Sequence, residues 1–322
     1  MRWDTVRRWA RLGVLCWLAV APGAAWLAMR LSGLEHGRLV QVVAFTPYVA
    51  AWSLLPVAFA LATRRWWAAA VAGLVVVGFA ACVLPRAISD GADPGGGPAL
   101  RVLTANLLAG AADPAALVEL VRRERVDLLA LQEFTPEAEA ALAGHGLTEL
   151  LPHHVGESRT GTSGSALYAR FSLTGTGVRA NAGGFRQAYG TLAVPGAQPV
   201  EVESVHPAAP YAPEVLPDWR ADLAAQRAAT PDGPTRILLG DFNATLDHAA
   251  LRRLIDTGYR DAASVTGAGL TGTWGPYDGD PIPPVTIDHV LADRRIGVRA
   301  VAVHDLRGSD HRPLLAELVL PG

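Results

Sequence analysis

The chain has 322 residues, of which 50% are hydrophobic and 18% charged, and its net charge is −2 because 30 acidic residues face 28 arginines and no lysine. Residues 1–90 hold nine arginines and three acids within long apolar runs, whereas residues 91–322 hold 19 arginines and 27 acids, a net charge of −8. That acidic balance argues against a domain that grips duplex nucleic acid with a broad basic face. Both cysteines, Cys16 and Cys82, lie in the apolar part, which excludes a disulfide framework in the acidic part.

Three apolar segments occupy the first part of the chain, at about 12–29, 39–62 and 66–84. Each is long enough to cross a hydrocarbon core of about 30 Å, so we expect three transmembrane helices, the second kinked at Pro47 and Pro56. Arginines precede the first segment and fill the connection between the second and third, which marks both as cytoplasmic. Three crossings then predict a multi-pass protein of the cell membrane with a cytoplasmic N-terminus and an extracytoplasmic acidic part.

The first segment has a second interpretation as a cleaved signal peptide, since Ala19-Val20-Ala21 resembles a cleavage site after a basic and apolar start. The two remaining segments would still leave the acidic part outside. We therefore predict a membrane anchor over 1–88, with the lipid bilayer as its partner and no protein partner inferred. Residues 89–99 are rich in Gly, Asp and Pro and are expected to be a flexible linker.

The acidic part begins with a strand–helix–strand pattern. Leu100–Ala105 and Val126–Leu131 are apolar runs of strand length, and Pro114–Arg125 has helical spacing with Asp113 as a plausible N-cap. This order predicts packed strands with covering helices. Further strands are expected at 165–169, 192–194, 200–205, 237–239, 283–291 and 314–320, and further helices at 219–229 and 248–257.

Polar residues recur where these apolar strands end. They are Asn106, Glu133, His206, Asp241, Asn243, Asp288, Asp310 and His311. Because strand ends form a rim in layered α/β domains, side chains from distant parts of the sequence can meet there. Asp241 and Asn243 are two apart and would project to the same side of an extended chain, although the same pair could simply form an Asx turn.

These segments together resemble the endonuclease/exonuclease/phosphatase superfamily, the DNase I-like metal-dependent phosphoesterases. The resemblance is carried by Leu-Thr-Ala-Asn106, Leu-Gln-Glu133, Ser-Val-His206-Pro, Gly-Asp241-Phe-Asn243, Thr-Ile-Asp288-His and Ser-Asp310-His311-Arg-Pro. It spans essentially the whole of a catalytic domain placed at 100–322. The fold it implies is an α/β (α+β) four-layer sandwich, in which two mostly antiparallel β-sheets pack face to face between layers of helices.

The resemblance also implies a divalent metal, Mg²⁺ with Mn²⁺ as a substitute. Glu133 is the expected first ligand, because Mg²⁺ prefers hard oxygen ligands and keeps several waters. Asn106 and Asp310 would complete the metal shell, directly or through water.

The remaining motif residues are expected to act on the phosphate and its water. Asp288 and His311 match the family's carboxylate–imidazole pair, and His206 matches a second histidine that contacts phosphate or protonates the leaving group. Asp241 would orient or deprotonate water or assist the leaving group, and Asn243 would donate to a phosphate oxygen. The choice of general base stays open.

We therefore expect a membrane-anchored, extracytoplasmic Mg²⁺-dependent hydrolase of phosphodiesters or phosphomonoesters, whose substrate is nucleic acid, phospholipid or a small phosphate compound. The alternative is a catalytically silent binding module on the same fold. His289 is expected to pack in the core, because alternation along a strand points it away from Asp288. Trp274 would line the substrate or the core, and Arg170 and Arg186 would hold phosphate or form surface ion pairs.

Overall fold

The computed structural model describes residues 2–93, 95–275 and 282–322. The chain folds into two compact units. The first comprises Met1–Pro85 with Asp247–Ala249, and the second comprises Arg86–Leu246 with Ala250–Gly322.

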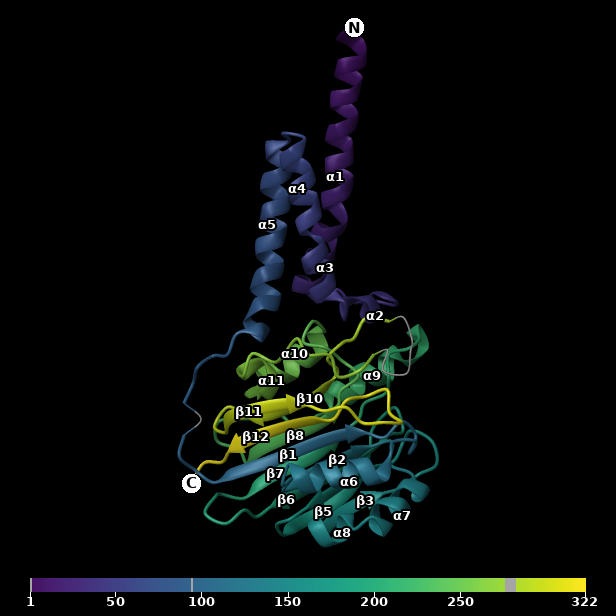
Figure 1. The fold of residues 1–322 in the computed structure, drawn as a ribbon, viewed down its shortest axis with the longest axis vertical. Coiled ribbons are helices and arrows are strands. Elements are labelled where there is room, and N and C mark those ends of the chain that lie inside the picture. The colour runs from purple at the N-terminus through teal and green to yellow at the C-terminus, as the bar shows by residue number, and fades with distance from the viewer. Residues whose placement is uncertain (1, 94, 276–281) are drawn as a thin grey trace. The chain divides into compact units, whose positions relative to one another are not determined.

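The first unit is helical (Figure 1). Its helices are α1 (Arg2–Ser32), α2 (Leu39–Val43), α3 (Thr46–Trp52), α4 (Leu54–Ala62) and α5 (Trp66–Val83), which continues into the 3-10 turn η1 (Leu84–Ala87). By length and composition two stretches could cross a membrane, Trp9–Ser32 and Trp66–Ala87. The middle segment differs from the one long helix that the sequence predicts: it is divided into α2, α3 and α4, and its longest apolar helical stretch is Thr46–Ala62.

Two prolines explain where the middle segment breaks. Pro47 and Pro56 lack the N–H that would bond the carbonyls of Val43 and Trp52, the last residues of α2 and α3. Hydroxyl groups bond carbonyls beside each break, since Thr46 Oγ1 donates to Val43 O at 2.6 Å and Ser53 Oγ donates to Ala50 O at 2.6 Å. Ser53, the one residue between α3 and α4, keeps a helical backbone with φ −63° and ψ −13°, so the break before Pro56 is a local kink of the kind expected.

The second unit contains two six-stranded sheets. One sheet has the order β11-β12-β1-β2-β4-β3, built from β11 (Gly297–Val303), β12 (Leu314–Val319), β1 (Ala99–Asn106), β2 (Leu128–Gln132), β4 (Ser165–Ala169) and β3 (His153–Glu157). The other has the order β5-β6-β7-β8-β10-β9, built from β5 (Leu173–Ala180), β6 (Arg186–Leu192), β7 (Val200–Val205), β8 (Thr235–Asp241), β10 (Asp288–Asp293) and β9 (Tyr259–Asp261). Only β1–β2 and β7–β8 pair in parallel among these strands, which confirms two mostly antiparallel sheets.

The expected strand–helix–strand unit is present as β1, α6 (Pro114–Arg123) and β2. The Asp113 carboxylate accepts from the N–H groups of Ala115 and Ala116 at 3.0 and 3.1 Å, so it caps α6 as predicted. The helix ends at Arg123, and Arg125 adopts a φ of 51° in the turn that leads to β2. Local capping and apolar periodicity were sufficient to place this unit.

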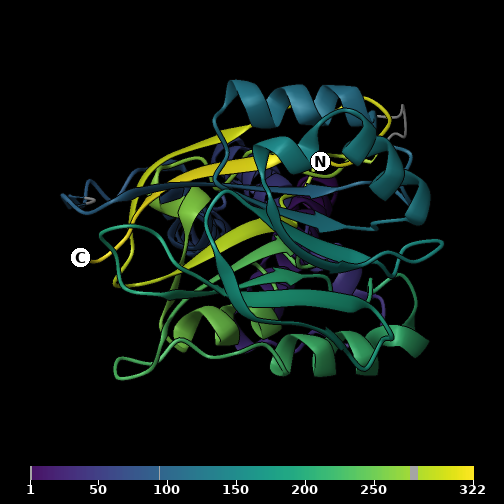
Figure 2. The same ribbon diagram turned by 90° about the horizontal axis from the view of Figure 1, so that it is seen from below.

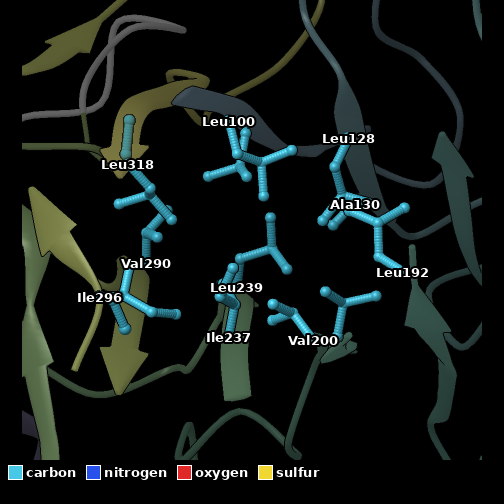
Figure 3. Close-up of a cluster of buried hydrophobic side chains, with 14 of the residues drawn as sticks. Leu100, Leu128, Ala130, Leu192, Val200, Ile237, Leu239, Val290, Ile296 and Leu318 are labelled. Atoms are coloured by element: carbon cyan, nitrogen blue, oxygen red, sulfur yellow. The ribbon is translucent and has the colours of Figure 1, made fainter. Parts of the chain in front are cut away.

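The sheets pack face to face between two layers of helices (Figure 2). Leu100, Leu128 and Ala130 of one sheet meet Leu239 and Val290 of the other in a buried apolar core (Figure 3). Helices α6, α7 (Pro136–Gly144) and α8 (Leu147–Leu150) cover the first sheet, and α9 (Leu216–Ala224) and α10 (Ala249–Asp256) cover the second. The short α11 (Ala262–Val265) contacts strands of both sheets, and Ala262 belongs to the core between them. The four-layer sandwich is thereby confirmed.

Several element boundaries differ from those predicted. β10 begins at Asp288 rather than at residue 283, because prolines at 283 and 284 have no N–H to give to a sheet ladder. Of the strand predicted at 192–194 only Leu192 lies in a strand, as the last residue of β6, and β3, β5, β9 and β11 were not predicted. The start of the predicted linker is held in place, since Ser89 pairs with Thr266 and Asp90 N donates to Val265 O at 3.0 Å.

Candidate active site

The predicted site residues lie at one edge of the two sheets. β10 runs antiparallel to β8 with Asp288 opposite Asp241, so the start of one strand meets the end of the other. The Asn106 amide, at the end of β1, connects the sheets: its Nδ2 donates to Asp241 Oδ2 at 3.1 Å and to Glu133 Oε1 at 3.2 Å. The sandwich thus brings residues more than a hundred positions apart into direct contact.

Asp241 is at the centre of this cluster and is 2% exposed. Besides the Asn106 amide, its Oδ2 faces Nε2 of His206 and Nε2 of His311, each at 3.7 Å. Burial raises the pKa of Asp241 to about 7; the Asp288 charge adds to the effect, while the His311 charge and hydrogen bonds from Asn106 and the Asn243 backbone oppose it. A carboxyl group with this pKa can exchange a proton near neutral pH.

His311 is held by Asp288. Its Nδ1–H donates to Asp288 Oδ2 at 2.9 Å, which fixes the ring orientation and leaves Nε2 facing Asp241. Burial opposes the charged ring, but the charges of Asp288, Asp241 and Asp310 and the Asp288 hydrogen bond raise the pKa of His311 to about 10. The ring is therefore an imidazolium at neutral pH, held among three carboxylates.

His206 has the opposite charge state. It follows β7, is 2% exposed, and packs edge-on against the Phe185 ring with 4.7 Å between centroids. Burial, together with the nearby His311 charge, lowers the pKa of His206 to about 3. Within the described part of the chain its buried Nδ1 has no hydrogen-bond partner, and the acid nearest to its Nε2 is Asp241. The two histidines thus present one neutral and one charged ring to Asp241.

The three expected metal ligands line the same edge. Glu133 follows β2 in the left-handed region at a φ of 55°, and Ala109 N donates to its Oε2 at 2.5 Å. Burial raises the pKa of Glu133, and the Asp310 charge adds to this increase. The hydrogen bonds from Ala109 and Asn106 oppose it. Asp310 accepts from Trp274 Nε1 at 2.9 Å through Oδ2, whereas its buried Oδ1 has no hydrogen-bond partner among the described residues and lies 4.0 Å from His311 Nε2.

This donor set fits a small hard cation. It offers two carboxylates and the Asn106 amide oxygen, which accepts from Leu108 N at 3.0 Å and from no other group in the described part of the chain. In the described residues no three His, Cys, Asp or Glu side chains are arranged to share a metal. That is compatible with Mg²⁺, which is often held by one or two carboxylates and completes its octahedron with water and substrate oxygens.

Asn243 forms hydrogen bonds within the protein through its backbone N–H and its side-chain amide. It adopts a φ of 47°, its N–H donates to Asp241 Oδ1 at 2.8 Å, and its Nδ2 donates to Pro207 O at 3.1 Å. The Asx turn considered as an alternative is therefore present. The bond to Pro207 uses one of the two N–H groups of the Asn243 amide, so the other can donate to a phosphate oxygen.

Three supporting residues were missed by the sequence reasoning. Thr273 Oγ1 accepts from Asp288 N at 3.0 Å, and the Phe185 ring packs on His206. Ser309 Oγ donates to Asn106 O at 2.9 Å and accepts from His311 N at 3.0 Å. Of these three residues only Ser309 lies within a recognised motif, Ser-Asp-His, so only its place in the site could have been predicted from the sequence.

The open interpretations of Trp274, Arg170 and Arg186 are resolved by their contacts. Trp274 bonds Asp310 and pairs with His311, so it belongs to the site. Arg170 pairs with Asp127 at 2.9 Å and Arg186 with Glu157 at 3.0 Å, which makes both arginines structural ion-pair partners.

Comparison with known proteins places this site in a family. The model of the Endonuclease/Exonuclease/phosphatase family matches residues 103–311, which is more than half of the chain and includes every predicted site residue. The chain belongs to this family. No curated protein matches it in sequence.

Solved structures share the family's fold at low sequence identity. An endonuclease/exonuclease/phosphatase from Beutenbergia cavernae is 19% identical with a TM-score of 0.56, over 70% of this chain and 72% of that one. The mannosyl-6-phosphatase of Bacteroides thetaiotaomicron is 16% identical with a TM-score of 0.51, over 69% and 100%. D. rerio TDP2, complexed with a single strand DNA product, is 16% identical with a TM-score of 0.54, over 68% and 98%.

Proposed function

We propose that this protein hydrolyses phosphoester bonds with a divalent metal, Mg²⁺ or Mn²⁺. The observation that carries the proposal is the convergence on Asp241 Oδ2 of the Asn106 amide and of Nε2 from His206 and His311. These groups come from strand ends of both sheets. Together they provide a proton acceptor, a fixed positive charge and a neutral imidazole within one buried cluster.

Each side chain is suited to one part of the reaction. Asp241 accepts a proton from the attacking water, because its pKa of about 7 allows it to be ionised and still basic near neutral pH. The His311 imidazolium, kept charged by Asp288, stabilises the negative charge that develops on the phosphoryl oxygens. His206 contacts the phosphate or the leaving oxygen through Nε2, and Asn243 donates to a phosphate oxygen through the amide N–H that is not bonded to Pro207.

Glu133, Asp310 and Asn106 would hold the metal. The Asp310 Oδ1, which has no hydrogen-bond partner among the described residues, and the buried Glu133 carboxylate are the groups that gain most from a cation. When bound, the metal neutralises phosphate charge and activates water. Trp274 keeps Asp310 oriented by donating to its other oxygen at 2.9 Å.

The substrate is proposed only as a class, a phosphodiester or phosphomonoester of nucleic acid, lipid or a small molecule. The similar structures include a mannosyl-6-phosphatase and a protein bound to a DNA product, so the shared fold accommodates different phosphoesters. The net charge of −8 over residues 91–322 favours substrates smaller than a long duplex.

We also propose that residues 1–88 anchor the protein in a membrane and that the catalytic domain faces away from the cytoplasm. The long apolar helices Trp9–Ser32 and Trp66–Ala87 support the anchor. The return crossing would be made by α3 and α4 together: Thr46 at the start of α3 accepts from Trp26 Nε1 at 3.0 Å, and Thr63 after α4 lies 3.4 Å from Cys16 Sγ. The pair therefore runs antiparallel to α1 in the first unit.

The decisive experiment measures hydrolysis by the full chain in detergent micelles, with Mg²⁺, with Mn²⁺ and with EDTA. The panel consists of bis(4-nitrophenyl) phosphate, 4-nitrophenyl phosphate, single-stranded DNA and phospholipid vesicles. Metal-dependent turnover that is lost in both Glu133→Gln and His311→Asn, but kept in the exposed-histidine control His153→Asn, supports the proposal. Absence of turnover on the whole panel, or turnover unchanged in both site variants, would refute it and favour the binding module.

A further inference from the structure

A second histidine–aspartate pair lies on the opposite side of β10 from Asp288. His289 is 0% exposed, and its Nδ1 lies 2.9 Å from Asp261 Oδ1 while its Nε2 lies 2.9 Å from the Ala244 carbonyl oxygen. Because successive residues of a strand point to opposite faces, His289 faces away from the reacting groups that Asp288 faces. The pair is therefore separate from the catalytic cluster although it is adjacent to it in sequence.

The hydrogen bonds define the charge of this ring. A carboxylate and a carbonyl are both acceptors, so each ring nitrogen needs a proton to bond both. Asp261 is already used as an acceptor at its other oxygen, since Ser264 N donates to Oδ2 at 2.8 Å at the start of α11. Burial opposes the charge, but the Asp261 hydrogen bond and charge raise the pKa of His289. A buried imidazolium–carboxylate pair results.

The ring holds the turn that follows β8. Ala244, whose carbonyl it bonds, comes directly after Asn243, and Asn243 N donates to Asp241 Oδ1 at 2.8 Å. The Phe242 ring, within the same turn, packs edge-on against His289 with 5.6 Å between centroids. His289 thus contacts the turn at two points on either side of Asn243.

From this geometry we infer that His289 is a positioning residue, whose doubly protonated ring is held by Asp261 and orients Asp241 and Asn243 through the Ala244 carbonyl. The inference rests on the proposed function, because the effect on turnover passes through Asp241. The expected effect on kcat of losing this ring follows from geometry, since displacement of a reacting group by about 1 Å can reduce a rate by about 100-fold. The ring itself contacts no reacting atom.

Two isosteric variants separate the two bonds of the ring. An Asn amide nitrogen occupies the place of Nδ1 and keeps the bond to Asp261, whereas a Gln amide nitrogen occupies the place of Nε2 and keeps the bond to Ala244. We expect His289→Asn to lower kcat on bis(4-nitrophenyl) phosphate by at least about tenfold with KM nearly unchanged, because the lost interaction orients the transition state. His289→Gln should retain kcat within about threefold. Equal effects of both variants, or no effect of His289→Asn, would overturn the inference.

A measurement that needs no turnover tests the same point. In the metal-free full chain with ring-¹⁵N-labelled histidine, we expect His289 to carry protons on both nitrogens at pH 6.5, the ordinary pKa of the ring, because its pKa is raised. The signals of His206 and His311 should shift in His289→Asn and stay in place in His289→Gln. If the wild type does not hydrolyse the probe, the proposed function fails while this spectrum still decides the inference: a neutral His289, or unshifted signals in His289→Asn, would overturn it.

Discussion

Replacing Asp288 with Asn directly tests whether this carboxylate keeps the His311 ring positively charged. Asp288 accepts from His311 Nδ1 at 2.9 Å and is the largest of the effects that raise the pKa of His311 to about 10. The difference between that pKa and the ordinary 6.5 corresponds to a net preference of about 5 kcal/mol for the charged ring, which remains after burial has opposed the effects of Asp288, Asp241 and Asp310. An amide at residue 288 is neutral, so it removes the largest share of this preference.

The direction in which activity changes with pH follows from the shifted pKa values of Asp241 and His311. Asp241 becomes ionised as the pH rises through about 7, and His311 keeps its charge until the pH rises through about 10. Wild-type activity should therefore rise as the pH passes through about 7 and should fall near pH 10. Bound metal favours the Asp241 carboxylate, so it would move the rise to a lower pH. In Asp288→Asn we expect the alkaline fall to move down by about 1–3 pH units, as is typical for the loss of an adjacent opposite charge.

The assay is kcat/KM for bis(4-nitrophenyl) phosphate between pH 5 and 11 in the full chain. At pH 8 we expect Asp288→Asn to lose about 10²- to 10⁴-fold in rate, the range that general acid–base groups contribute. Asp261→Asn is the matched control, because it alters an equally buried aspartate that also lies 2.9 Å from a histidine. Its alkaline fall should stay where the wild type has it. An Asp288→Asn profile that superimposes on the wild type after scaling would refute the reasoning.

Three further predictions concern the metal, its support and the strand end. Glu133→Gln should weaken Mg²⁺ binding, measured by calorimetry, by at least about tenfold because a buried carboxylate becomes neutral; unchanged affinity would remove Glu133 from the metal site. Trp274→Phe removes the donor to Asp310 and should weaken the same binding by about 10- to 100-fold, and equal affinity would show that Asp310 needs no support. Gly240→Ala would place a Cβ 2.0 Å from the Val205 carbonyl oxygen and should cost about 3 kcal/mol or prevent folding; a wild-type melting temperature would contradict this contact.

Much of the catalytic domain follows from local sequence. The buried strands β1, β2, β8 and β12 are nearly continuous apolar runs, and Asp113 caps the helix between β1 and β2, so each could be placed without its neighbours. Strands β5 and β3 escaped because they are exposed at sheet edges and carry no strong apolar pattern. Prolines gave the correct positions of the breaks in the middle apolar segment, but not that it would divide into separate helices.

The residues of the site were also readable from strand ends, since polar side chains there follow apolar runs in a recognisable order. Their partners were predicted only in part: the family resemblance paired Asp288 with His311, but nothing in the sequence paired His289 with Asp261. In the sequence Asp288 is next to His289 and Asp310 is next to His311, yet Asp288 bonds His311 and Asp261 bonds His289. Alternation sends neighbours on β10 to opposite faces, and the register of β10 with β8 and β9 then decides which distant side chain each one meets. The sequence by itself therefore determined which residues could act, and the pairing of strands decided how they are combined.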